Sequence, residues 1–168
     1  MLRSRLTALA AGTLFMFGLA LAPAGVTAAA VHARPPFVQT QNPAKKMVTL
    51  FVDAQSTSAN SGFNFNGLAK GKGEVTVPLG WEVTVQFLNH GAIPHSAVVT
   101  KSRTGITPAF PGAGMAHATT GIGKNHRAHF AFRASRAGTY YIVCAVPGHE
   151  PADMWVRLIV SPHAKKAS

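Results

Sequence analysis

Three side chains that commonly bind metals follow one another near the carboxyl end of the sequence. Cys144, His149 and Met154 form a Cys-x4-His-x4-Met pattern, with Pro147-Gly148 supplying a turn inside it. A soft thiolate, an imidazole nitrogen and a thioether together suit copper, and a second histidine would complete a trigonal site with a weak axial methionine. The pattern therefore predicts a copper ligand loop that lacks one histidine.

The missing histidine is expected just after residue 89, where His90 and His95 compete. Pro94 stiffens the chain before His95, and residues 96–100 after it have the β-branched character of a strand. His90 instead adjoins a glycine in a turn, where exposure to solvent is expected. We therefore predict four metal ligands: His95, Cys144, His149 and Met154.

Two predicted strands enclose the ligand loop. Residues 138–143 are an aromatic and β-branched run that would bring Cys144 to the end of a buried strand, and residues 155–160 form a strand directly after Met154. Further strands are predicted at residues 47–52, 63–67, 74–79, 81–89, 96–100 and 126–133. Short strands separated by turn signals, without a helical period after residue 30, indicate an all-β fold, an antiparallel Greek-key sandwich or barrel.

Residues 101–125 form a long segment that is rich in Gly, Ala, Thr and Pro and has no sustained periodicity. Loops of this length inside a compact domain are often functional, so Phe110 and Met115 are candidates to cover the metal end of the barrel. Met115 and His117 are also backup metal ligands. A place on the loop surface is the simpler interpretation for both.

The chain divides into four regions by composition. Residues 1–30 combine Arg3 and Arg5 with an apolar stretch and a run of small residues, as a secretory signal peptide does. An uncleaved N-terminal anchor is the alternative, because the apolar stretch reaches the lower limit for crossing a bilayer. We expect residues 31–46 to be a linker or arm, residues 47–160 to be the folded domain and residues 161–168 to be a basic tail.

The charge balance is strongly basic, with a net charge of +11 at pH 7 and only five acidic residues. Such a balance can serve nucleic-acid binding, but these basic residues are scattered and export would separate the chain from nucleic acid. We therefore expect an anionic protein or membrane surface as partner and no nucleic acid. Few carboxylates would also suit an acidic exterior, because few groups would become protonated on acidification.

The single cysteine restricts the chemistry further. A chain with only Cys144 has no internal disulfide, and an exported thiol must be spared oxidation in another way. Binding to a metal would occupy the sulfur and protect it. One cysteine also excludes a binuclear thiolate-bridged copper centre, which needs two.

The pattern Asn89-x5-His95-Ser96, followed by Cys144-x4-His149-x4-Met154, resembles the blue-copper proteins of the cupredoxin family. The chain is most similar to the sulfocyanins, with rusticyanin as the nearest alternative, and the resemblance covers residues 47–160. The further features that carry it are Phe63-Asn64-Phe65-Asn66-Gly67, Ala109-Phe110-Pro111-Gly112-Ala113 and Trp155 directly after Met154. Asp153 departs from the pattern, because such loops commonly have a glycine before the methionine.

The resemblance implies a cupredoxin fold that holds one copper ion and shuttles one electron outside the cytoplasm, in a respiratory chain, with a cytochrome or terminal oxidase as redox partner. Residues 1–30 could tether the protein to a membrane, and we expect a monomer without catalytic residues. Copper delivery or storage with the same ligands is the main alternative. An enzyme with Cys144 as nucleophile and His149 as base is a third hypothesis, which leaves His95 and Met154 without a role.

Overall fold

The computed structural model describes residues 35–168, which form a two-sheet β-sandwich with one short 3-10 helix, η1 (Ala59–Gly62). The strands within these residues are β1 (Val38–Asn42), β2 (Met47–Ala54), β3 (Glu74–Pro78), β4 (Glu82–Asn89), β5 (Val98–Thr100), β6 (Arg127–Arg133), β7 (Gly138–Val143) and β8 (Trp155–Ser161).

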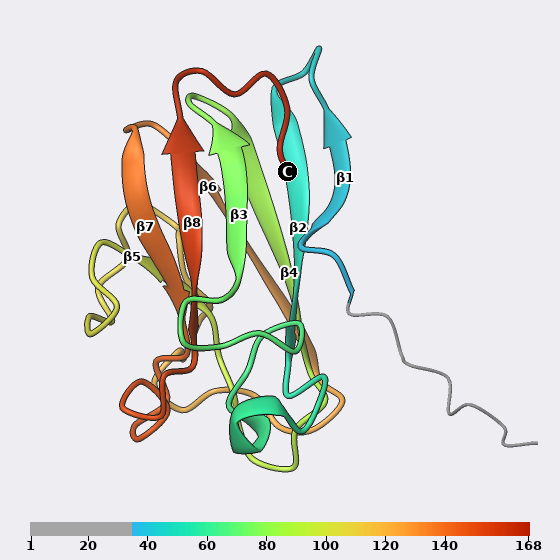
Figure 1. The fold of residues 1–168 in the computed structure, drawn as a ribbon, viewed down its shortest axis with the longest axis vertical. Coiled ribbons are helices and arrows are strands. Elements are labelled where there is room, and N and C mark those ends of the chain that lie inside the picture. Colours follow the sequence, from blue (N-terminus) through green and yellow to red (C-terminus); the bar gives the residue numbers. More distant parts are fainter. Residues whose placement is uncertain (1–34) are drawn as a thin grey trace, which may run out of the picture. The chain divides into compact units, whose positions relative to one another are not determined.

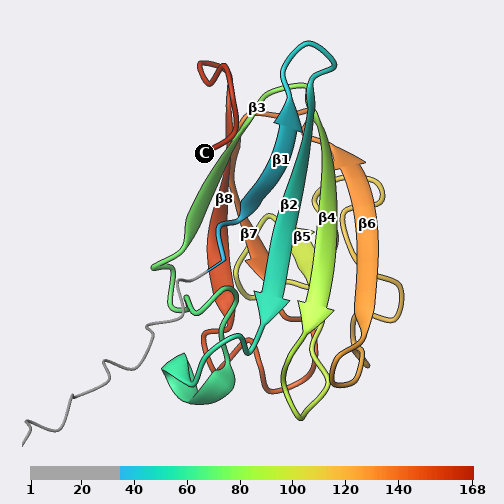
Figure 2. The ribbon, with the colours of Figure 1, turned by 90° about the vertical axis from the view of Figure 1, so that its right-hand side faces the viewer.

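The strands form two four-stranded sheets that face each other (Figures 1 and 2), one in the order β1-β2-β4-β6 and the other in the order β3-β8-β7-β5. The predicted all-β sandwich is confirmed. The sheets are mixed rather than purely antiparallel, because β2 pairs with β4 and β3 pairs with β8 in parallel. Parallel neighbours need long crossover connections, and local sequence patterns do not show them.

Alternating side chains on the strands fill the space between the sheets. In β4, Val83, Val85 and Phe87 are buried while Glu82 and Gln86 are exposed. β8 repeats the alternation with buried Val156, Leu158 and Val160. Full burial of one such apolar side chain contributes roughly 1.5–3 kcal/mol. The common core of the two sheets is therefore the rigid body on which the loops are mounted.

Two predictions at the ends of the domain need correction. The predicted arm, residues 31–46, contains strand β1, which pairs antiparallel with β2. The predicted basic tail, residues 161–168, is packed onto the domain, because Ala167 is buried and Ser168 exchanges two backbone hydrogen bonds with Thr76. The predicted signal peptide or anchor, residues 1–30, lies outside the described residues.

The predicted strand at residues 63–67 is a turn instead. Only Phe65 makes strand-like bridges, to Ala54 and Leu68. Asn66 adopts a positive φ of 51°, and its side chain accepts from the Asp53 backbone N–H while donating to the Phe51 carbonyl. The asparagines of this segment therefore bond the backbone, as short amide side chains do in turns.

The loops that follow β2, β4 and β7 all lie at one end of the sandwich, the lower end in Figures 1 and 2. The segment containing η1 follows β2, the residues around His95 follow β4, and the Cys144–Met154 loop follows β7. The topology thus brings both predicted ligand segments to the same end. None of the helices within residues 35–168 has the length and apolar character needed to cross a membrane.

Candidate metal centre

Three of the four predicted ligands form one buried cluster. The donor atoms of His95, Cys144 and His149 all lie within 4.8 Å of one another. The Cys144 Sγ is 3.9 Å from Nδ1 of His95 and 3.2 Å from Nδ1 of His149, so both rings present the same nitrogen to the sulfur. Soft sulfur and neutral imidazole donors without a carboxylate are a donor set suited to copper.

Met154, the fourth predicted ligand, is fully buried and tied to the same cluster through the backbone. Its N–H donates to the His149 carbonyl at 3.1 Å, and its own carbonyl accepts from the Cys144 N–H at 3.2 Å. The ligand loop therefore closes on itself. Its first and last residues are adjacent at the end of the β7–β8 pair, and this pairing holds both sulfur residues in place.

Two residues with positive φ shape this loop. Gly148, at φ +88°, makes the turn before His149, as the Pro147-Gly148 pair predicts. Asp153, at φ +59°, adopts the left-handed conformation that glycine favours. Its carboxylate accepts from the Trp155 Nε1–H at 3.2 Å. Short polar side chains tolerate this conformation better than others, which explains how an aspartate can stand where similar loops carry glycine.

The segment that carries His95 is held by a separate set of hydrogen bonds. His95 and Ile122 exchange two backbone bonds of 3.2 and 2.9 Å, which tie the ligand to the long loop. The buried Asn89 side chain donates to the carbonyls of Ile93 and Ile122 and accepts from the Gly91 N–H. One amide therefore fixes the whole turn between β4 and His95.

The cysteine sulfur is buried and receives hydrogen bonds from its neighbours. Ser96 N–H donates to Sγ at 3.4 Å. Burial raises the pKa of the Cys144 thiol, while the backbone N–H groups of Ser96 and Val146 act in the opposite direction. The Ser96 amide therefore bonds the sulfur directly. A metal cation would supply the positive charge that a buried thiolate needs.

Burial also keeps both imidazoles neutral, which is the form that binds a metal. It lowers the pKa of His95 to about 4, with a smaller contribution from His149, and lowers the pKa of His149 as well. His149 is 7% exposed, whereas His95, Cys144 and Met154 are 0% exposed. His149 is thus the one predicted ligand with any access to solvent. Its exposed fraction is small for a residue in the middle of a loop.

The two competing histidines do not belong to this cluster. His90 is half-exposed, and its Nδ1 lies 2.7 Å from the buried carboxylate of Asp53. His117 is exposed in the long loop, as expected. Met115 is buried, which contradicts its interpretation as a surface residue, and its sulfur accepts from the Ala97 N–H at 3.2 Å. Phe110 packs against Phe132 and Tyr140 in the core instead of covering the cluster.

Two neighbours of the histidines had no predicted role. The Phe63 ring meets the His149 ring edge-on at a centroid distance of 5.0 Å and lies 6.4 Å from the His95 ring. Gln55 Oε1 lies 3.4 Å from Nε2 of His95. The sequence motif Phe63–Gly67 contains Phe63, but the motif alone indicated no function for this residue. No sequence signal distinguished Gln55, because a lone glutamine after a strand is common.

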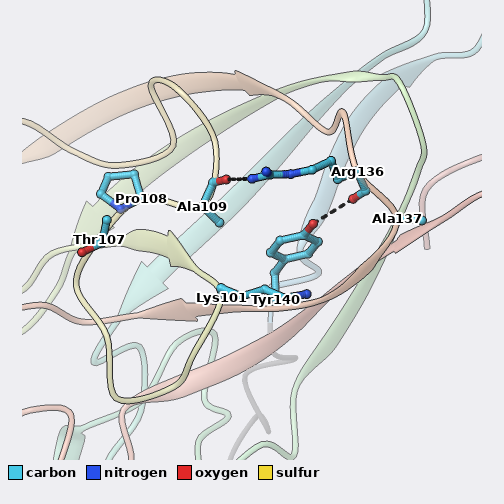
Figure 3. Close-up of a pocket in the computed structure, with 7 residues that line it drawn as sticks. All are labelled: Lys101, Thr107, Pro108, Ala109, Arg136, Ala137 and Tyr140. Atoms are coloured by element: carbon cyan, nitrogen blue, oxygen red, sulfur yellow. Dashed lines mark hydrogen bonds between the residues drawn. The ribbon is translucent and has the colours of Figure 1, made fainter.

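A separate pocket lies away from the predicted ligands. It has a volume of about 460 Å³ and is lined by Lys101, Arg136 and Tyr140 together with Thr107 to Ala109 and Ala137 (Figure 3). A smaller groove of about 310 Å³ borders the ligand loop from Cys144 to Pro151. Thr104, Ile106 and Thr119 of the long loop form its other side, so this loop does border the cluster.

The chain matches the family model for the sulfocyanin (SoxE) domain over residues 37–166. It is 32% identical over 129 residues to a sulfocyanin from Sulfolobus acidocaldarius. The alignment covers 69% of this chain and 64% of that relative, so the chain spans less than two-thirds of the relative's length.

Solved blue-copper structures share the fold. An auracyanin from Roseiflexus castenholzii has a TM-score of 0.50 at 25% identity, covering 68% of this chain and 97% of that one. A blue copper oxidase from Nitrosomonas europaea has a TM-score of 0.53 at 26% identity, covering 69% of this chain and 39% of that one. These similarities confirm the sandwich as a cupredoxin fold.

Proposed function

We propose, on the premise that this chain belongs to the sulfocyanin family of blue-copper proteins, that it transfers single electrons between redox partners through one copper ion. The proposed ligands are His95, Cys144, His149 and Met154. The observation that carries the proposal is the buried cluster in which two imidazole Nδ1 atoms face one cysteine sulfur. The donor set fits copper. The family model and the curated relative that match this chain are sulfocyanins, so rusticyanin, the alternative resemblance, does not enter the proposal.

Bound copper would supply a one-electron couple between its cupric and cuprous states. The protein's part is to keep the donor atoms in place in both states, because little rearrangement permits fast transfer. Two strands hold Cys144 and Met154, and the Ile122 pairing holds His95. The buried setting excludes water from the sulfur and keeps both imidazoles neutral. Hydrogen bonds from Ser96 and Val146 to the sulfur would tune the potential.

Copper reconstitution with an absorption spectrum tests this function. One equivalent of Cu(II) should give an intense thiolate-to-copper band, and Cys144→Ser should abolish it, because a hydroxyl stays protonated and is a poor soft donor. Stoichiometric zinc binding by a protein that stays colourless with copper would overturn the proposal.

A matched pair of histidine variants tests the ligand assignment. His95→Ala should open a coordination position that added imidazole can fill, with recovery of the colour. His90→Ala should leave the spectrum unchanged, because His90 contacts Asp53 and not the cluster. The reverse pattern would exchange the roles of the two histidines.

Copper delivery with the same ligands is the alternative function. Delivery needs ligands that an acceptor can reach, but three of the four proposed ligands are 0% exposed. Slow exchange of the bound metal supports electron transfer, whereas rapid transfer to an acceptor would support delivery. The third hypothesis, an enzyme with Cys144 as nucleophile, is also disfavoured. Burial raises the pKa of the Cys144 thiol and keeps a substrate away from the sulfur.

The location and partners follow from the same premise. We propose that the protein works outside the cytoplasm, in a respiratory chain, as a monomer that docks with an acidic cytochrome or terminal oxidase. The basic net charge of +11 supports an anionic partner. The basic residues and the apolar stretch of residues 1–30 support export or a membrane tether.

A further inference from the structure

The outer nitrogen of His95 faces a specific side chain. The ring presents Nδ1 to the Cys144 sulfur at 3.9 Å, and its other nitrogen, Nε2, lies 3.4 Å from the amide oxygen of Gln55. Gln55 and His95 are far apart in sequence, since Gln55 directly follows β2 and His95 lies beyond β4. The imidazole is therefore held between a sulfur on one side and an amide on the other.

The surrounding backbone is built to admit the Gln55 side chain. A Cβ atom at Gly62 would lie 2.7 Å from Gln55 Nε2. A Cβ atom at Gly91 would overlap Gln55 Oε1 and come within 2.8 Å of His95 Nε2. Any larger residue at either glycine would displace the amide. The amide therefore occupies a slot between two glycines that approach it from different loops.

The backbone of Gln55 is also held in an unusual conformation. Its φ is +52°, which is uncommon for a residue other than glycine, and its N–H donates to the Asn64 carbonyl at 2.9 Å. Such a conformation persists where the surrounding structure determines it. This conformation directs the residue after β2 toward the cluster, so the contact does not depend on a freely rotating surface side chain.

A neutral imidazole has one N–H, and its position decides which nitrogen can bind a metal. Gln55 Oε1 is an acceptor, so the proton belongs on Nε2. Nδ1 then keeps its lone pair, and Nδ1 is the atom that faces Cys144 Sγ. An acceptor on the outer nitrogen also orients the ring and increases the electron donation from the inner nitrogen.

We propose that Gln55 is a positioning residue that fixes the Nε2–H tautomer of His95 and thereby sets its donor strength toward copper. The tautomer rests on the positions of Gln55 and Cys144 around the His95 ring, whereas the effect on copper rests on the proposed function. A glutamine is a neutral acceptor that cannot ionise. It holds the ring without placing a charge beside the metal centre.

Nitrogen NMR of the metal-free protein tests the tautomer without copper. The wild type should show His95 as the Nε2–H form, and Gln55→Leu should populate both tautomers because the acceptor is gone. Gln86→Leu, at an exposed position of β4, is the matched control and should match the wild type. An Nδ1–H form in the wild type, or an unchanged tautomer in Gln55→Leu, would overturn the proposal.

The reduction potential of the copper-loaded protein tests the donor strength. Gln55→Leu should shift it upward, because a less basic His95 stabilises the cupric state less. Gln55→Glu keeps the shape of the side chain and adds a stronger acceptor, so it should shift the potential downward. Equal potentials in both variants would contradict the proposal. A protein that shows the Nε2–H tautomer but no blue band would retain the tautomer assignment and reject the proposed function instead.

Discussion

Asp153 is a residue whose backbone and side chain have separable effects. Asp153→Ala should lower the free energy of unfolding by about 1–2 kcal/mol, because alanine at positive φ is strained and the bond to Trp155 is lost. Asp153→Gly loses the same bond but accepts the conformation at φ +59°, so its loss should be smaller. Urea denaturation of the metal-free variants measures both. Equal losses would show that the hydrogen bond matters and the backbone does not.

Met154 would supply the fourth, weak sulfur donor in the proposed site. Met154→Leu should keep copper bound and raise the reduction potential, because losing a weak donor destabilises the cupric form more than the cuprous form. Met154→Gln should lower it by offering a harder oxygen donor. Voltammetry of the two variants gives the comparison. Unchanged potentials in both would show that Met154 is not axial, despite its burial beside His149 and Cys144.

Residue chemistry predicted the three side chains that the structure brings together, His95, Cys144 and His149. Cys144, His149 and Met154 stand close in sequence, and Pro94 with the following strand distinguished His95 from His90. The positions of Gln55 and Phe63 could not be predicted in the same way. They approach the histidines only because the loop after β2 folds back across the same end of the sandwich, which is a long-range property of the fold.

At the scale of elements, β1 shows why a strand was missed. Its burial pattern has no fully buried residue, and Gln39 and Gln41 give it no apolar face. Strand prediction depends on alternating apolar and polar residues, so an exposed edge strand gives little signal. The parallel pairing of β2 with β4 was missed for a different reason, since pairing partners far apart in sequence leave no local pattern.

The edge strand β1 is joined to the carboxyl end of the described chain by one side chain. Gln41 Nε2 donates to the Ala167 carbonyl at 3.2 Å, and its Oε1 accepts from the Ala167 N–H at 2.8 Å. Gln41→Ala should lower the free energy of unfolding by about 1–2 kcal/mol, since two partly buried hydrogen bonds are lost. Gln39→Ala, on the same exposed strand, is the control. Equal thermal denaturation of the two variants would contradict this role.

At the scale of the whole molecule, the buried histidines make the metal-free protein sensitive to acid. Unfolded histidines take up protons near pH 6.5, whereas folded His95 does so only near pH 4 because burial lowers its pKa. The unfolded chain therefore binds more protons between these values, and stability falls as the pH falls through this window. The loss from His95 should reach at most about 3 kcal/mol.

Denaturant titration of the metal-free protein at pH 7 and pH 4.5 measures this effect, with His95→Asn as the control that should show a smaller loss. Asp53 acts in the opposite direction, because burial raises its pKa and the folded state then favours the protonated carboxyl in acid. Equal pH dependence of the wild type and His95→Asn would show that His95 does not control acid stability.

We expect a redox partner to dock on the surface above the proposed site. His149 is the one proposed ligand with access to solvent, and Ile93 and Pro94 are exposed beside His95. A flat apolar patch tolerates transient docking, while the basic net charge attracts an anionic partner and raises the encounter rate. Ile93→Asp should therefore slow electron transfer to an acidic cytochrome without changing the copper spectrum. Leu79→Asp, an equally exposed apolar position after β3 at the opposite end of the sandwich, should not slow it.

Salt separates the two contributions, since screening weakens attraction between charged surfaces and leaves the apolar contact in place. Raising the ionic strength should lower the second-order rate of the wild type by roughly tenfold or more if charge steers the encounter. Ile93→Asp should remain slower than the wild type at every salt concentration, because its defect lies in contact with the patch. Stopped-flow kinetics measures both. If the rates respond to salt but not to Ile93→Asp, the partner docks on another surface of the molecule. The groove beside Ile106 would then be the next site to test.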